Sequence, residues 1–150
     1  LYEGDGSKGL QAARAIGMLN YRTAAQFNDA QPDDSEHLTD FRAPSYIRYH
    51  GQKLVDRFDA ACYYKLTEQL DTHHMGRGRG GLQSALKEIT VPTLVIGISS
   101  DVLIPVAVQE ELATNLPNAT LKVVDSKYGH DGFLIEYPQI NAAVAAFYHE

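Results

Sequence analysis

The spacing of apolar residues predicts a helical first half. They recur three and four positions apart, as in amphipathic helices, over residues 9–20, 46–56 and 59–70. The stretch 29–45 between the first two segments is polar and acidic and contains two prolines, which predicts a loop. Ser45, at the end of that loop, is a suitable N-cap for the helix that follows.

The second half follows a different pattern. VPTLVIGIS, residues 91–99, is almost continuously apolar and β-branched, as in a strand buried on both faces of a parallel sheet. TLKVVD, residues 120–125, predicts a second strand. Helical spacing predicts further helices over residues 82–88, 105–115 and 138–148. The order strand, helix, strand, helix predicts an α/β protein with a right-handed parallel βαβ unit.

A glycine-rich stretch separates the two patterns. MGRGRGG, residues 75–81, follows a predicted helix and not a strand, so it does not predict a dinucleotide-binding loop. We therefore divide the chain into a helical region over residues 1–75, a junction over 76–81, and an α/β part over 82–150.

Composition argues against several classes of function. Thirteen Lys and Arg against nineteen Asp and Glu give a formal net charge of −6, which argues against a nucleic-acid or membrane-surface partner. No apolar run approaches the roughly 20 residues of a membrane span. The single cysteine, Cys62, favours a reducing, cytoplasmic compartment, and its place on an apolar helical face predicts a buried thiol. Adjacent His73 and His74 point in different directions on a helix, so we expect no metal site.

Side chains that can act as nucleophiles, acids or bases follow both predicted strands. Ser99-Ser100-Asp101 follows the first strand, and DSKYGHD, residues 125–131, follows the second. Because parallel strands end at the same edge of a sheet, we expect Asp101 and His130 to lie on one edge. A carboxylate bound to one imidazole nitrogen fixes the tautomer and leaves the other nitrogen as a base. The sequence thus predicts two members of a nucleophilic triad, in the chain order of the α/β-hydrolase fold.

The catalytic interpretation has an alternative. An Asp after a strand commonly caps the next helix, and a His before a helix is commonly a loop residue, although their joint placement favours catalysis. No serine lies in a Gly-x-Ser-x-Gly turn, so either the chain is not catalytic or the nucleophile lies upstream of Leu1. We also expect apolar surface of the strand over 91–98 to be exposed, and to require an N-terminal part or another polypeptide as cover.

Several segments together resemble the homoserine O-acetyltransferase family. They are GLQAARAIGMLNYRT, SYIRYHGQKLVDRFDAACYYKLTEQLDTH, RGRGG, GISSDVLIP and SKYGHDGFLIEY. The resemblance covers residues 9–149 and concerns only the C-terminal portion of such enzymes, which belong to the α/β-hydrolase superfamily. It implies that residues 9–75 are the helical lid, which commonly supports a homodimer. It also implies that the serine and the oxyanion hole belong to a missing N-terminal half.

The resemblance further implies roles for four residues. Asp101 in SSDVLIP matches the triad acid, and His130 in YGHD matches the triad base. Asp131 matches a residue that binds the substrate amino group. Arg14 in AARAIG matches the arginine that binds the amino-acid carboxylate, a task suited to its planar fork.

The implied reaction is a ping-pong acyl transfer in methionine biosynthesis. Acetyl-CoA, a substrate and not a cofactor, acylates the serine, and the hydroxyl of L-homoserine then takes the acetyl group. The chain alone is expected to be inactive. The alternatives are a serine O-acetyltransferase, a succinyl-CoA-using relative, a plain esterase, or a degenerate hydrolase-fold remnant that acts as a binding module.

Overall fold

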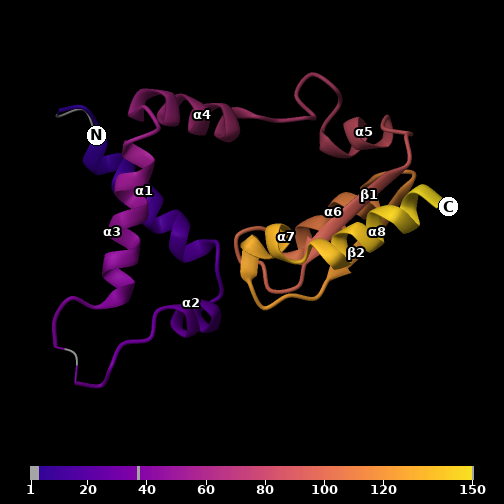
Figure 1. Ribbon diagram of the computed structural model, residues 1–150. Coiled ribbons are helices and arrows are strands. Elements are labelled where there is room, and N and C mark those ends of the chain that lie inside the picture. The colour runs from indigo at the N-terminus through magenta and orange to yellow at the C-terminus, as the bar shows by residue number, and fades with distance from the viewer. Residues whose placement is uncertain (1–3, 37, 150) are drawn as a thin grey trace. The chain divides into compact units, whose positions relative to one another are not determined.

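The chain forms two compact units, whose elements are labelled in Figure 1. The computed structural model describes residues 4–36 and 38–149, so residues 1–3, 37 and 150 of the predicted regions lie outside the described residues. The first unit comprises residues 1–20 and 24–73, and the second comprises residues 21–23 and 74–150. Within the described ranges, no helix is both long enough and apolar enough to cross a membrane.

The first unit is helical, as its sequence predicts. Its helices are α1 (Ser7–Asn20), α2 (Ala24–Ala30), α3 (Arg42–Val55) and α4 (Ala60–Thr72). α1 packs against α3, and Figure 1 shows the two helices crossing side by side. Gly51 of α3 permits this close packing, because a Cβ there would lie 3.3 Å from the carbonyl oxygen of Gln11. Leu10, Met18 and Leu54 are buried in the same unit.

The start of α3 differs from the prediction. The helix begins at Arg42 and not at Tyr46, with Phe41 and not Ser45 at the N-cap position. Pro44 lies in the first turn, where a missing N–H costs no intrahelical hydrogen bond. The Asp33 carboxylate accepts a hydrogen bond from the backbone N–H of Arg42, at 3.0 Å, and stabilises the earlier start. A carboxylate of the preceding loop therefore satisfies a backbone N–H in the first turn of this helix.

The start of α4 agrees with the prediction, but its cysteine does not. The side chain of Asp59 caps the helix by accepting from the backbone N–H of Cys62 at 2.8 Å. The thiol of Cys62 is exposed, so the prediction of a buried cysteine is wrong for this chain. Apolar residues elsewhere on α4, such as Leu66 and Leu70, are exposed as well.

The second unit contains the predicted βαβ arrangement. Its elements are α5 (Leu82–Lys87), β1 (Thr93–Ile98), α6 (Val106–Asn115), β2 (Ala119–Val124), the 3₁₀ turn η1 (Gly129–Asp131), α7 (Gly132–Ile135) and α8 (Tyr137–His149). β1 and β2 are parallel, and Ile98 lies opposite Val124 at their carboxyl ends. The α/β class and the parallel pairing are therefore confirmed.

Helices cover both faces of the two strands. A Cβ at Gly97 would lie 3.6 Å from the side chain of Gln109, which places this position of β1 against α6. Leu94, on the opposite face by strand alternation, lines a depression shared with Ala143 of α8. Val95, on the α6 side, packs with the buried Leu86 and Leu116.

The burial of β1 corrects one expectation in part, because residues 93–98 are covered whereas Val91 and Pro92 before them are exposed. The sequence predicts that this strand leaves apolar surface exposed when the chain is alone. In the structure Val95 and Ile98 are buried and Leu94 and Ile96 are half-buried, because the helices of the same unit cover them. Exposed apolar side chains remain at Val91, before β1, and at Val102, Leu103 and Leu134 of α7 beyond the carboxyl edge.

Candidate active site

A carboxylate and an imidazole meet beyond the carboxyl ends of the two strands. Asp101 lies in the loop after β1, and His130 lies in η1 after β2. The Oδ2 atom of Asp101 is 2.8 Å from Nδ1 of His130. The Asp101 side chain is only 6% exposed, whereas that of His130 is 24% exposed and so accessible to a reactant. The structure thus brings together the two residues that the strand order predicts at one edge.

The Asp101 carboxylate is oriented by the backbone of its own loop. Its Oδ1 atom accepts hydrogen bonds from the backbone N–H groups of Leu103, at 2.8 Å, and Ile104, at 2.9 Å. These bonds precede α6, whose N-cap position is Pro105, so Asp101 is not the side-chain cap of that helix. Both oxygens of the carboxylate are engaged, and rotation would break at least one of these bonds.

This arrangement fixes the proton on the imidazole. An ionised carboxylate only accepts hydrogen bonds, so Nδ1 of His130 donates and the lone pair of a neutral ring lies on Nε2. The ring also packs against two aromatic side chains, with centroid distances of 5.7 Å to Tyr21 and 5.2 Å to Phe133. His130 is therefore held as a base that acts through Nε2.

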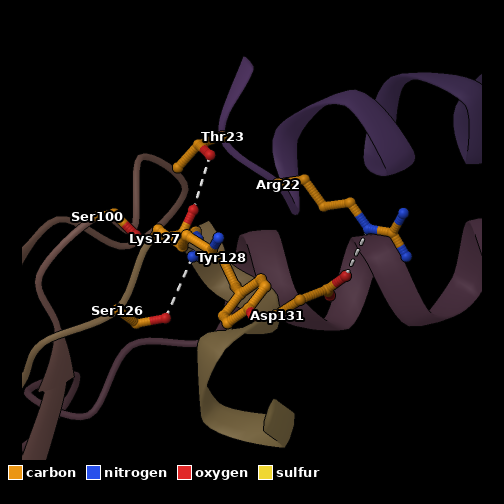
Figure 2. Close-up of polar contacts among 8 residues, drawn as sticks. Arg22, Thr23, Ser100, Ser126, Lys127, Tyr128 and Asp131 are labelled. Carbon is orange, nitrogen blue, oxygen red and sulfur yellow. Dashed lines mark hydrogen bonds and ion pairs between the residues drawn. The ribbon is translucent and has the colours of Figure 1, made fainter. Parts of the chain in front are cut away.

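Two serine hydroxyls connect the loop before His130 to the end of β1, and a third lies within the loop. Oγ of Ser99 accepts from the backbone N–H of Ser126 at 3.0 Å, and Oγ of Ser100 accepts from that of Gly129 at 2.9 Å. Oγ of the buried Ser126 accepts from the backbone N–H of Tyr128 at 3.1 Å, as Figure 2 shows. In this structure these hydroxyls position the loop.

A tripeptide from the connection between α1 and α2 binds the same loop. The backbone N–H of Asp131 donates to the carbonyl of Tyr21 at 2.9 Å. The Thr23 hydroxyl donates to the carbonyl of Lys127 at 2.7 Å, and Nε of Arg22 lies 3.0 Å from Oδ2 of Asp131 (Figure 2). We call residues 21–23 the clasp. The residues of the clasp, and the partners of the three contacts named here, belong to the second unit.

Sequence reasoning missed the clasp. Arg22 and Asp131 are 109 residues apart, and no local period connects them. One signal in the sequence could have indicated it: the first segment that resembles the family ends in NYRT, residues 20–23, which includes the clasp.

The remaining predicted residues are placed as follows. Asp131 adjoins His130 and pairs with Arg22. Arg14 lies on α1 in the first unit and is half-buried. Their roles toward an amino-acid substrate remain predictions. Within residues 4–36 and 38–149, no group of three or more His, Cys, Asp or Glu side chains is arranged to hold a metal ion.

Curated sequences that are similar to this chain include two homoserine O-acetyltransferases. A homoserine O-acetyltransferase of Salinibacter ruber is 46% identical over 146 residues, and one of Cyclobacterium marinum is 43% identical over 145. The alignments include 94% and 97% of this chain but only 41% of each relative, in the C-terminal portion. The chain thus spans less than half the length of the curated relatives it matches. No protein-family profile matches the chain.

Solved structures show the same fold. A homoserine O-acetyltransferase from Bacillus anthracis superposes with a TM-score of 0.85 at 18% identity, over 97% of this chain and 42% of that one. Esterase E22 gives 0.78 at 20% identity, over 94% and 42%. An α/β hydrolase from a deep-sea metagenome, MGS-M2, gives 0.56 at 21% identity, over 96% and 48%. At these identities the likeness concerns the fold, which is part of an α/β-hydrolase fold.

The close approach of the clasp to Gly129 generates a test. Gly129 has φ +68°, and a Cβ there would lie 3.0 Å from backbone atoms of Tyr21, Arg22 and Thr23. Gly129→Ala should therefore combine backbone strain of about 1–2 kcal/mol with overpacking of about 1–3 kcal/mol. Gly78→Ala is the matched control, because Gly78 has φ +74° and no neighbouring atom within 4 Å.

Urea denaturation of both variants measures the difference. We expect Gly129→Ala to lower the free energy of unfolding clearly more than Gly78→Ala does. Equal losses of unfolding free energy in the two variants would show that the clasp does not pack tightly against Gly129 in the loop 125–131.

Proposed function

We propose, from the premise that the chain belongs to the homoserine O-acetyltransferase family, that it supplies the acid and base of an acyltransferase triad. The observation that carries the proposal is the 2.8 Å contact between Asp101 and Nδ1 of His130. It leaves Nε2 of a partly exposed imidazole as the base. The serine nucleophile and the oxyanion hole would come from an N-terminal part, and this chain alone would be inactive.

The proposed reaction has two half-reactions that share one base. In the first, Nε2 of His130 takes the serine proton while the serine oxygen attacks the acetyl carbonyl, and the departing CoA sulfur receives that proton as the C–S bond breaks. In the second, Nε2 takes the proton of the homoserine hydroxyl, whose oxygen attacks the acyl-enzyme, and the serine oxygen leaves with that proton. Asp101 stabilises the imidazolium formed in both steps.

An amino-acid acceptor offers one ammonium and one carboxylate group. We propose that Asp131 accepts hydrogen bonds from the ammonium and that Arg14 binds the carboxylate. Neither residue distinguishes homoserine from serine, because both amino acids carry the same ammonium and carboxylate groups and the extra methylene is contacted elsewhere. We further propose a cytoplasmic enzyme of methionine biosynthesis that uses acetyl-CoA and dimerises through the helices of residues 9–75.

A plain esterase is the second candidate, because the same dyad serves ester hydrolysis and esterase E22 shares this fold. Assays of the full-length protein with homoserine or serine as acceptor, and acetyl-CoA or succinyl-CoA as donor, discriminate the alternatives. We expect the homoserine and acetyl-CoA pair to give the highest kcat/KM. Hydrolysis of simple esters without acyl transfer would favour the esterase, and no activity would favour a binding module.

The triad roles predict the behaviour of two variants in the first half-reaction. His130→Ala should abolish the burst of CoA release, because the serine loses its base. Asp101→Asn should slow it about 10⁴-fold by favouring the wrong imidazole tautomer. His74→Ala, at an exposed histidine, is the control and should retain the burst. An undiminished burst in His130→Ala would exclude His130 as the base.

Arg14→Ala should separate the two half-reactions. Its guanidinium would contact only the acceptor, so the burst of CoA release should persist while transfer to homoserine becomes weak at ordinary concentrations. A single-turnover measurement of CoA, followed by titration with homoserine, measures both. If Arg14→Ala blocked the burst as fully as His130→Ala, Arg14 would have a structural role instead.

A further inference from the structure

The ion pair between Arg22 and Asp131 engages one of the two carboxylate oxygens of Asp131, the residue proposed to bind the ammonium group of the acceptor. Nε of Arg22 contacts Oδ2 at 3.0 Å, and the two side chains are 24% and 21% exposed. Among the described residues, no hydrogen bond is formed to Oδ1 of Asp131. The backbone N–H of Asp131 is held by the carbonyl of Tyr21. Both the main chain and one carboxylate oxygen of Asp131 are thus fixed by the clasp, while the second oxygen stays available.

We propose that Arg22 is a positioning residue for the acceptor: it orients the Asp131 carboxylate so that Oδ1 receives the ammonium of the amino acid. This rests on the proposed function, in which Asp131 is the ammonium ligand. Asp131 directly follows His130 in η1, so rotation of its carboxylate changes where an acceptor sits relative to the base. Arg22 itself does not touch the reacting atoms in this proposal.

Two physical effects of Arg22 oppose each other. A guanidinium beside a carboxylate weakens the attraction of that carboxylate for a second cation. It also prevents the carboxylate from rotating away, and a charge-assisted hydrogen bond is strong and directional. The pair is mostly buried, so the orientation is retained against water. We expect the orientation of the Asp131 carboxylate to outweigh its weakened attraction for the ammonium. Loss of Arg22 should therefore raise the KM for the acceptor.

The Arg22→Gln variant of the full-length protein tests whether the KM for the acceptor rises or falls. The burst of CoA release should stay within about twofold of wild type, because the donor half-reaction does not use Asp131. The KM for homoserine should rise about 10- to 100-fold, the range expected for loss of a hydrogen bond to a charged group. Arg57→Gln is the control, since Arg57 is exposed and its side chain forms no ion pair or hydrogen bond within the described residues.

Two comparisons separate positioning from a general structural role. The acceptor 4-hydroxybutanoate lacks the ammonium, so Arg22→Gln should leave its KM unchanged. The double variant of Arg22→Gln with Asp131→Asn should be no worse than Asp131→Asn alone, because both act through one contact.

The outcomes distinguish this inference from the proposed function. If wild type gives no CoA burst, the proposed function fails, and this inference fails with it. If wild type gives the burst, the inference is overturned by a homoserine KM that is unchanged or lowered in Arg22→Gln. Loss of the burst in Arg22→Gln, or an equal effect on 4-hydroxybutanoate, would also overturn it and assign Arg22 to the support of His130.

Discussion

The site depends on one hydrogen bond, from Nδ1 of His130 to Asp101. The parallel register of β1 and β2 places the two strand ends level, and Asp101 is turned toward the imidazole by two backbone N–H groups. A hydrogen bond to a charged group contributes about 1.5–3 kcal/mol. Fixing the backbone of each residue in loop 125–131 costs about 1–2 kcal/mol. This bond therefore sets the tautomer of His130 but cannot hold the loop in place by itself.

The loop is held by groups on two sides. Ser99 and Ser100 bind it from the end of β1, and the clasp of residues 21–23 binds it from the connection between α1 and α2. The segment between two helices of the first unit thus belongs physically to the site. In this arrangement the clasp contacts the loop before His130 at Lys127 and directly after it at Asp131.

Sequence patterns predicted the elements whose causes are local. The β-branched run of β1 and the polar residues after each strand sufficed to place Asp101 and His130 at one edge. The pattern failed where contacts beyond the local period contribute: Asp33 binds the first turn of α3 from the preceding loop, and Arg22 contacts Asp131 across 109 residues. It also failed for Cys62, because helical spacing identifies an apolar face but not whether anything covers it. The role of Arg14 remains a prediction from the family resemblance.

Asp101 holds His130 as the Nδ1–H tautomer, with Nε2 free to act as a base. Nitrogen-15 NMR of histidine-labelled protein, recorded where the imidazole is neutral, measures this directly. We expect His130 to be Nδ1–H in wild type and to shift toward Nε2–H in Asp101→Asn. The exposed His74 should be unchanged and serves as the internal reference. A wild-type His130 in the Nε2–H form, or a tautomer ratio insensitive to Asp101→Asn, would contradict the account.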